Sequence, residues 1–385
     1  MTVIAPLLWT LPWVVPPIIG LWRARRSRSL DEFSAVAPDD APFVSVIIPA
    51  RDERRNIERC VRSVLASTYP YFEVIVVDDH STDGTGELAR AIATDDPRVR
   101  VIDAPRLPGD WFGKQWACST GAHVATGSLL LFTDADTAHA PDLLPRSVNA
   151  LRVRTAEMFS VAGHQELHSF WERVVQPMVF GLLSLRYGGM EDVSATRNPS
   201  HAIANGQFIL VQRDAYEAMG GHERVKHTVA EDLMLAQEWV RAGRRLVLML
   251  GLKQLSTHMY ASLSEIIAGW RKNIYAGGRM ASIGGRVGRA LYPAFLIGTP
   301  LLGLVPVVAL LLAGFGILSA PWLIWSATIV VVGLLFWGAI YHFMSEARAY
   351  ALLYPIGLAV LLYIATSSVW RGEQVQWKQR EYRAG

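Results

Sequence analysis

The sequence has very few cysteines and little charge. Only Cys60 and Cys118 occur in 385 residues, and they show no metal-ligand spacing, so we expect free thiols and no disulfide framework. Charged residues make up 18% of the chain, below the roughly one quarter of an average globular protein. The net charge of +3 also lacks the basic excess typical of nucleic-acid-binding proteins. These shortages exclude a disulfide scaffold and argue against nucleic acid as a partner.

Long apolar runs take the place of the missing charge, and the first lies at the N-terminus. Residues 2–22 contain no charged residue and match the roughly 20-residue helix that crosses a bilayer. Arg23, Arg25, Arg26 and Arg28 follow at once, whereas a cleavable signal peptide carries its positive charge before the apolar stretch. The positive-inside rule therefore predicts an N-terminus outside and the next domain in the cytoplasm.

The last third of the chain carries three more uncharged runs, at 291–318, 321–343 and 349–370. Each is long enough to cross a bilayer. Three crossings would place the tail outside, whereas the four basic residues of 371–385 favour the cytoplasmic side. The first run contains three prolines and is compatible with a broken or re-entrant segment. The number of crossings therefore stays open.

The middle of the chain, from residue 41 to about 250, alternates between strand and helix patterns. Such alternation is typical of an α/β domain with a mostly parallel sheet covered by helices on both faces. The apolar run 43–48 is a buried strand that we expect to end at Pro49. The other expected strands are 73–77, 99–102, 129–132, 208–211 and 246–250, and the expected helices are 53–67, 113–125, 170–187, 229–241 and 263–279.

The most informative stretch is the apolar strand 129–132, which leads directly into Asp134 and Asp136. Residues i and i+2 of an extended chain point the same way, so both carboxylates reach the C-terminal end of the sheet together. Open α/β sheets bind ligands at that end. Two carboxylate ligands suit a divalent cation whose shell is completed by a phosphate. The same residues are also compatible with an Asx-capped turn.

Two further acidic pairs and one lysine are candidates for the same edge. Asp78 and Asp79 follow a buried strand, where carboxylates suit ribose hydroxyls or an imide N–H; a turn without a ligand is the simpler reading. Glu231 and Asp232 begin a helix, where acidic side chains also serve as caps. Lys114 near another helix start can meet a phosphate, although such a lysine is often only solvated.

Taken in order, these motifs resemble the family-2 glycosyltransferases of the GT-A fold. The resemblance covers roughly residues 43–275, over half of the chain. Each motif alone is weak, and their order makes the set specific. The matching pieces are Val-Ser-Val-Ile-Ile-Pro-Ala-Arg-Asp-Glu at 44–53, Val-Val-Asp-Asp-His-Ser-Thr-Asp-Gly-Thr at 76–85, Gly-Lys at 113–114, Thr-Asp-Ala-Asp at 133–136 and Ala-Glu-Asp at 230–232.

The resemblance implies a role for each site residue. The turn after the first strand and the first acidic pair would hold the nucleoside of a UDP- or GDP-sugar donor, and the Thr-Asp-Ala-Asp motif would carry Mg²⁺ or Mn²⁺. The residues concerned are Pro49, Ala50, Arg51, Glu53, Asp78 and Asp79 for the nucleoside, Lys114 for the diphosphate, Asp134 and Asp136 for the metal with Asp134 also contacting the donor, and Asp232 as general base with Glu231 beside it.

One departure from the family separates this chain from its polymer-forming members. Those enzymes carry Gln-x-x-Arg-Trp before their C-terminal membrane helices, whereas residues 268–273 here read Ala-Gly-Trp-Arg-Lys-Asn. The chain is instead similar to membrane glycosyltransferases of carotenoid and hopanoid pathways. The similarity lies in this element, in the single N-terminal anchor and in the tail Trp-Lys-Gln-Arg-Glu-Tyr at 377–382.

The predicted function is an inverting, metal-dependent transfer of one sugar from a nucleotide-sugar to a hydroxyl of a membrane lipid. Two alternatives stay open: a nucleotidyltransferase on a similar sheet, and a membrane scaffold that retains a degenerate glycosyltransferase domain. The first would release pyrophosphate from a nucleoside triphosphate, and the glycine-rich phosphate loop that it needs is not found in the sequence. All three acidic sites are present, which disfavours the second.

The predicted protein is a multi-pass protein of the cytoplasmic membrane whose catalytic domain faces the cytoplasm. Its expected parts are an N-terminal anchor at 1–22, a basic linker at 23–40, a GT-A catalytic domain at 41–260, an amphipathic membrane-interface helix at 261–290, a C-terminal transmembrane region at 291–370 and a basic tail at 371–385.

Overall fold

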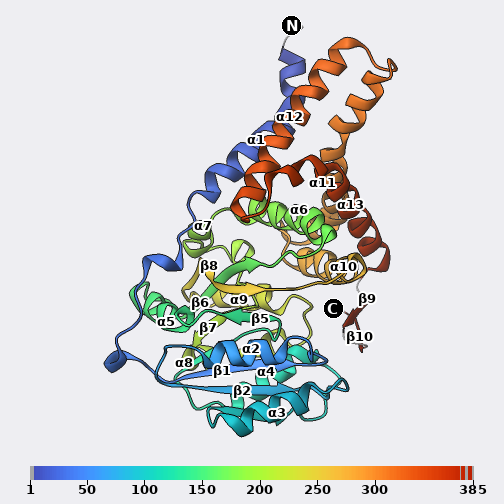
Figure 1. Cartoon of the computed structure of the whole chain (residues 1–385). Coiled ribbons are helices and arrows are strands. Elements are labelled where there is room, and N and C mark those ends of the chain that lie inside the picture. Colours follow the sequence, from blue (N-terminus) through green and yellow to red (C-terminus); the bar gives the residue numbers. More distant parts are fainter. Residues whose placement is uncertain (1–3, 373, 378–379, 384–385) are drawn as a thin grey trace. The chain divides into compact units, whose positions relative to one another are not determined.

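The computed structural model describes residues 4–372, 374–377 and 380–383. The chain divides into two compact units. The sheet unit comprises residues 27–166 and 190–259 together with the C-terminal segment after residue 372, and the helical unit comprises residues 1–26, 167–189 and 260–372. Figure 1 labels the elements of both.

A mixed sheet of eight strands in the order β3-β2-β1-β4-β7-β6-β8-β5 forms the centre of the sheet unit. Four of its seven pairings are parallel, and β7 runs antiparallel to both of its neighbours. The predicted α/β class is confirmed. The strands are β1 (Val44–Ala50), β2 (Phe72–Asp78), β3 (Val99–Asp103), β4 (Leu129–Phe132), β5 (Thr137–His139), β6 (Met158–Gln165), β7 (Ile209–Gln212) and β8 (Leu246–Thr257).

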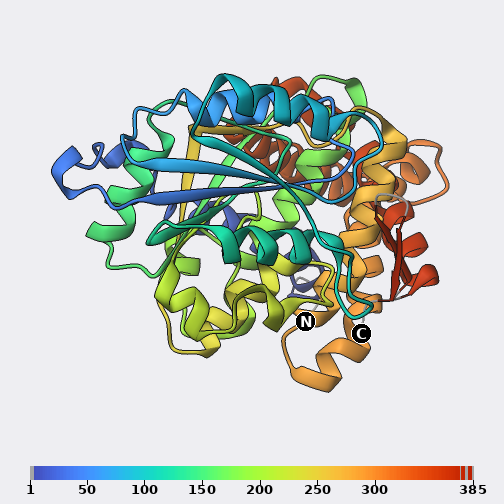
Figure 2. The same ribbon diagram turned by 90° about the horizontal axis from the view of Figure 1, so that it is seen from below.

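Helices cover both faces of this sheet because the central strands are apolar on both sides. Val44 and Val46 of β1 belong to one buried cluster with Ile57 and Val61, whereas Ile47 faces the helix on the opposite side. Figure 2 shows α2 and α3 on one side of the blue strands and α4 on the other. The helices of this unit are α2 (Ile57–Leu65), α3 (Thr85–Asp95), α4 (Gly113–Val124), α5 (Leu143–Val153), α7 (Met190–Ser194), α8 (Arg213–Ala218) and α9 (Glu231–Arg241).

The first strand does not end at Pro49, so that prediction was wrong. It runs on to Ala50, with Pro49 paired to Val77 of β2. On its other side β1 is paired with β4 only as far as Ile47, which lies opposite Phe132. Pro49 is therefore beyond the last β4 pairing, where a missing N–H interrupts no ladder. The parallel strands β1, β2 and β4 thus end at one edge of the sheet.

The helical unit contains the apolar helices. Three helical segments of the described chain are long and apolar enough to cross a membrane: Gly285–Gly314, Ala320–Phe343 and Arg348–Arg371. The first, α11, is one continuous helix through its three prolines, so the break that the prolines had left open is not observed. Figure 1 shows α11 and α12 as a long hairpin. The helices of this unit are α1 (Ile4–Ala24), α6 (Phe170–Tyr187), α10 (Leu263–Met280), α11 (Gly285–Gly314), α12 (Ala320–Phe343) and α13 (Tyr354–Arg371).

Candidate active site

The turn that carries Asp134 and Asp136 joins β4 to β5, and buried hydroxyl groups hold it in place by hydrogen bonds. The Thr133 hydroxyl donates to the Gln207 carbonyl at 2.7 Å, and the Thr137 hydroxyl donates to the Asp134 carbonyl at 2.8 Å. These bonds satisfy the main chain of the turn inside the protein. The two carboxylates therefore project from a rigid support.

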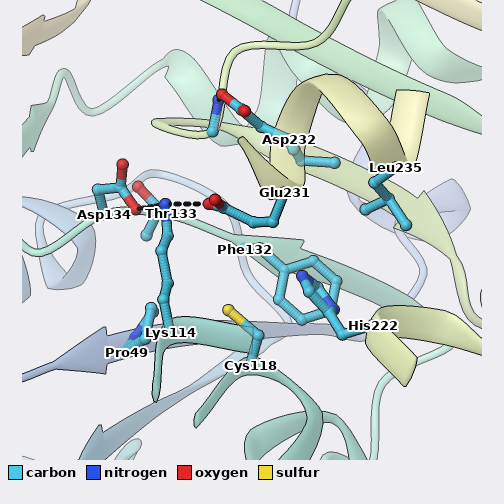
Figure 3. Close-up of a pocket in the computed structure, with 12 residues that line it drawn as sticks. Pro49, Lys114, Cys118, Phe132, Thr133, Asp134, His222, Glu231, Asp232 and Leu235 are labelled. Atoms are coloured by element: carbon cyan, nitrogen blue, oxygen red, sulfur yellow. Dashed lines mark hydrogen bonds and ion pairs between the residues drawn. The ribbon is translucent and has the colours of Figure 1, made fainter. Parts of the chain in front are cut away.

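Lys114 lies between carboxylates that come from distant parts of the chain. It is the second residue of α4, and its Nζ lies 2.6 Å from Asp134 Oδ1 and 2.5 Å from Glu231 Oε1. Figure 3 shows the ammonium between these two groups. Desolvation disfavours the charged amine, but the nearby Asp134, Glu231 and Asp232 outweigh it and hold the pKa of Lys114 well above its usual value. The ammonium is therefore charged at neutral pH.

Asp232 is held in place by two main-chain N–H groups. Its Oδ2 accepts a hydrogen bond from Gly206 N at 3.0 Å, and its Oδ1 accepts one from Leu233 N at 2.7 Å. Burial, followed by the charge of Glu231, raises the pKa of Asp232 to about 6. A carboxylate with such a pKa is ionised at neutral pH and is a stronger proton acceptor than an ordinary aspartate.

A pocket brings together five of the residues predicted from the sequence: Pro49, Lys114, Asp134, Glu231 and Asp232. They come from β1, α4, the end of β4 and the start of α9. Figure 3 shows the Asp134 and Glu231 carboxylates facing the Lys114 ammonium, with the Asp232 carboxylate pointing away from it. The rest of the lining is Cys118, Phe132, Thr133, Gly206, Ile209, His222 and Leu235.

Asp136 lies outside the lining of this pocket and has an unusual environment. Its Oδ1 is buried, and no hydrogen-bond partner for it occurs in the described part of the chain. Burial, with the charges of Asp134 and Glu53, raises the pKa of Asp136 to about 8. A bound cation would relieve this cost of a buried carboxylate.

The donor set is consistent with a divalent cation that needs a substrate to complete its shell. Within the described residues, no group of three or more His, Cys, Asp or Glu side chains is arranged to hold a metal ion. Mg²⁺ and similar ions are commonly held by one or two carboxylates plus substrate phosphates. Asp134 and Asp136 together match that pattern.

Asp79 is covered by arginines at the end of β2. Arg380 donates to both of its carboxylate oxygens, at 2.5 Å and 3.1 Å, and Arg51 Nη1 lies 3.8 Å from Oδ2. The Asp79 side chain keeps only 2% of its exposure. Its neighbour Asp78 accepts a hydrogen bond from the main-chain N–H of Ser81 at 3.1 Å. The first acidic pair therefore lies at the same strand edge but in a separate environment.

The remaining predicted residues join the turn after β1 to the loop after β2. The carbonyl of Ala50 accepts from Asp79 N at 2.8 Å, and Arg51 Nη1 donates to the Asp79 carbonyl at 2.5 Å. The Glu53 main-chain N–H donates to the Thr85 hydroxyl at 2.8 Å. These bonds hold the expected nucleoside-binding turns against each other.

Two site residues, Gly206 and Arg380, were not singled out by the sequence analysis, and a third, Thr133, entered it only as part of the Thr-Asp-Ala-Asp motif. Thr133 and Gly206 act through contacts that only the folded chain creates, although the Asn-Gly pair at 205–206 is a turn signal. Arg380 was considered only as part of a basic tail. Its position 301 residues after Asp79 left no local pattern to connect them.

Comparisons with known proteins identify similar sequences and a similar fold. The model of the family described as "Glycosyl transferase family 2" matches residues 45–220. A 4,4'-diaponeurosporenoate glycosyltransferase of Staphylococcus haemolyticus is 26% identical over 239 residues, covering 61% of this chain and 61% of that protein. The same-named enzyme of Staphylococcus aureus is 27% identical over 240 residues, again 61% of each. The chain thus spans less than two thirds of the length of these relatives.

A shorter match and a solved structure complete the comparison. A glycosyltransferase of Haloferax volcanii is 36% identical over 112 residues, which are 29% of this chain and 36% of that protein. A mannosyltransferase of Pyrobaculum calidifontis, solved in complex with GDP-Man and Mn²⁺, aligns with a TM-score of 0.61 over 95% of this chain and 98% of that chain, at 22% identity. The fold is therefore GT-A, and residues 45–220 are similar to glycosyltransferase family 2.

Proposed function

We propose that this chain transfers one sugar from a UDP- or GDP-sugar to a hydroxyl of a membrane lipid, with inversion at the anomeric carbon. The observation that carries the proposal is the pocket in which Lys114 lies between Asp134 and Glu231, with Asp232 beside them. Such a pocket combines a cation for a leaving diphosphate with a carboxylate of raised pKa for proton transfer.

In this mechanism Lys114, Asp134 and Asp136 stabilise the leaving nucleoside diphosphate. Lys114 places a positive charge where negative charge develops on the leaving nucleoside diphosphate. Asp134 and Asp136 would hold Mg²⁺ or Mn²⁺, which supplies further charge stabilisation to the diphosphate when bound. The mannosyltransferase of similar fold was solved with Mn²⁺ and GDP-Man, which supports this choice of cofactor and donor.

Asp232 is proposed as the general base. It accepts the proton of the acceptor hydroxyl while that oxygen attacks the anomeric carbon opposite the leaving group. A single displacement of this kind inverts the anomeric configuration. Two main-chain N–H groups fix the carboxylate, so little reorganisation is needed at the moment of transfer.

A lipid acceptor is favoured by the apolar helices and by the relatives. Three helical segments can cross a bilayer, and two relatives are named as glycosyltransferases of 4,4'-diaponeurosporenoate. We propose a multi-pass protein of the cytoplasmic membrane, with the catalytic domain at 41–260 on the cytoplasmic side and membrane segments at 1–22 and 291–370. The acceptor is then a carotenoid, a hopanoid or a related lipid with a free hydroxyl.

The test uses the full chain purified in detergent, with UDP-glucose or GDP-mannose and a lipid extract containing hydroxylated carotenoids. We expect nucleoside diphosphate release that requires both the lipid and Mn²⁺ or Mg²⁺ and that EDTA abolishes, together with a lipid product one hexose heavier by mass spectrometry. Pyrophosphate release from a nucleoside triphosphate would support the nucleotidyltransferase alternative. Absence of turnover with every donor and lipid would support a scaffold.

A further inference from the structure

The C-terminal segment forms a hairpin that reaches the donor edge of the sheet unit. Strands β9 (Gln374–Trp377) and β10 (Arg380–Arg383) pair antiparallel with each other. They form a two-stranded sheet of their own rather than an extension of the eight-stranded one. An isolated two-stranded hairpin is only marginally stable in water. Its side-chain contacts with the sheet unit therefore matter for its position.

Arg380 makes such a contact, and it does so on a carboxylate of the proposed donor site. Its two terminal nitrogens each donate a hydrogen bond to one carboxylate oxygen of Asp79, at 2.5 Å and 3.1 Å. Bidentate guanidinium–carboxylate pairs are among the stronger and more directional hydrogen-bonded pairs in proteins. Asp79 is buried, and Arg380 is the group that contacts both of its carboxylate oxygens.

A second positive charge, that of Arg51, lowers the cost of separating Arg380 from Asp79. Removing one partner of a buried ion pair is normally costly because it leaves an uncompensated charge. Here Arg51 lies 3.8 Å from Asp79 Oδ2 and also donates to the Asp79 carbonyl. Asp79 thus keeps a neighbouring positive charge when Arg380 moves away.

We propose that the C-terminal hairpin is a strap that closes the donor site, and that Arg380 and the donor nucleoside compete for Asp79. The inference rests on the proposed function, in which the lone pairs of Asp79 accept hydrogen bonds from the base or ribose. Both oxygens accept from Arg380 and Asp79 is only 1% exposed, so the guanidinium must move before a nucleoside can reach the carboxylate. Donor binding and opening of the hairpin are then one coupled equilibrium.

The first experiment measures the Kd of UDP and of GDP, each with Mn²⁺, by calorimetry on the full chain. In the variant Arg380→Gln, nucleotide binding no longer has to break the contact between the hairpin and Asp79. We therefore expect the Kd of the nucleotide to fall by about tenfold. The control is Arg98→Gln, which breaks another two-contact Arg–Asp pair, with Asp96, at 2.7 Å and 3.0 Å. That pair lies before β3, at the opposite end of the sheet, and we expect no change in Kd. An unchanged or higher Kd in Arg380→Gln would overturn the strap.

The second experiment follows the hairpin itself by hydrogen–deuterium exchange of the peptide that covers residues 374–383. In the wild-type chain, saturating UDP or GDP should accelerate exchange, because displaced Arg380 releases the hairpin. In Arg380→Gln, exchange should be fast without nucleotide. Slower exchange on nucleotide binding would show that the hairpin closes over the donor and would overturn the competition.

The variant Asp79→Asn separates failure of the strap from failure of the donor site. If nucleotide binds to the wild-type chain and Asp79→Asn weakens it, while Arg380→Gln has no effect, only the strap is refuted. If neither the wild-type chain nor Arg380→Gln binds UDP or GDP, or if Asp79→Asn leaves the Kd unchanged, the assignment of Asp79 to the donor fails and the strap fails with it.

Discussion

At the scale of single residues, the pocket crowds one ammonium among three carboxylates. Lys114 contacts Asp134 and Glu231 directly, and Asp232 also contributes to its raised pKa. Without the ammonium, the like charges of the carboxylates would favour protonation of at least one of them. The charge of Lys114 therefore lowers the pKa of Asp134, Asp136 and Asp232 against the effect of burial, and the same charge is available to a diphosphate.

Replacement of Lys114 by methionine tests this role. Lys114→Met removes the charge and keeps the length of the side chain, so we expect kcat/KM to fall by about 100-fold, as when one charge-stabilising group of an active site is removed. Lys253→Met is the matched control, because Lys253 is 78% exposed and pairs with Asp31 far from the pocket. Steady-state kinetics on both variants gives the comparison. Equal activities in the two variants would refute the role.

Asp232→Asn tests the general base. Asparagine has the same shape and can still accept the hydrogen bond from Gly206 N, so nucleotide binding should be retained. Turnover should fall by about 10²–10⁴-fold, the usual contribution of a general base. Calorimetry with UDP or GDP and a turnover assay on the same preparation separate the two effects. Turnover at the wild-type rate would remove Asp232 from this role.

The pH dependence follows from the raised pKa of the same carboxyl. A base works only when deprotonated, and Asp232 in the donor-free enzyme has a pKa of about 6. With saturating Mn²⁺, which keeps Asp136 deprotonated, we therefore expect kcat/KM to be flat above pH 7 and to fall about tenfold per pH unit below pH 6. The residual activity of Asp232→Asn should not show this fall of kcat/KM below pH 6. An acid limb near pH 4, the ordinary range of an aspartate, would contradict the assignment.

At the scale of elements, the position of Lys114 depends on how closely α4 approaches the sheet. Gly121 lies on the buried face of α4, and a Cβ atom built on it would come within 2.5 Å of Ile47 and 3.1 Å of Val77. Only a residue without a side chain allows this approach. The packing of one helix on β1 and β2 thus helps to set the location of the ammonium at the start of that helix.

We expect Gly121→Val to lift α4 from the sheet. Overpacking a close contact costs about 1–3 kcal/mol, so thermal unfolding should occur at a lower temperature and the donor affinity should fall as Lys114 moves. Gly109→Val is the control, since no atom lies within 4 Å of a Cβ at that position. Thermal melting and nucleotide titration on both variants test this. Wild-type stability in Gly121→Val would show that the contact is not tight.

At the scale of the whole molecule, the hairpin constrains how the chain crosses the membrane. Arg380 contacts Asp79 within the sheet unit. In the proposed multi-pass protein, this contact requires the tail and the catalytic domain to lie on one side of the bilayer. The chain between Met259 and Gln374 must then cross an even number of times. Under this proposal three full crossings are incompatible with the contact, and the basic tail is expected on the cytoplasmic side.

The helix expected not to cross fully is α13. In the most apolar part of the segment Arg348–Arg371, which contains α13, 39% is buried against protein. The corresponding share is 17% for α11 and 28% for α12. The Ser368 hydroxyl donates to the Arg271 carbonyl of α10, and Gly357 lies against Met178 of α6. Such packing against partly polar helices suits a segment that is covered by protein rather than by lipid.

Cysteine labelling of intact cells tests the crossing number. The native Cys60 and Cys118 are buried, so the wild-type chain serves as the unreactive control. We expect a membrane-impermeant maleimide to label Ser319→Cys, between α11 and α12, from outside, and to label Glu87→Cys and Ala384→Cys only after permeabilisation. If Ala384→Cys reacts from outside while Glu87→Cys does not, the number of crossings is odd.

The sequence by itself determined those features that depend on local pattern. Apolar runs of strand length predicted β1, β2 and β4, and the carboxylates that follow β2 and β4 lie at one edge of the sheet, as expected. The long uncharged runs predicted the apolar helices for the same reason, because hydrophobicity over a window is a local property. The helix 170–187 was predicted from its apolar run with its observed bounds, and in the structure Ser169 and Glu172 form a capping box at its start.

Only the tertiary structure decided the features that depend on contacts between distant residues. The antiparallel direction of β7, the bridge from Lys114 to Glu231 and the bond from Gly206 to Asp232 have no signature in the neighbouring sequence. Arg380 is the extreme case, because its partner lies 301 residues away. A strand pattern specifies burial but not direction, and a charged residue does not specify its partner; packing of the whole sheet unit determines both.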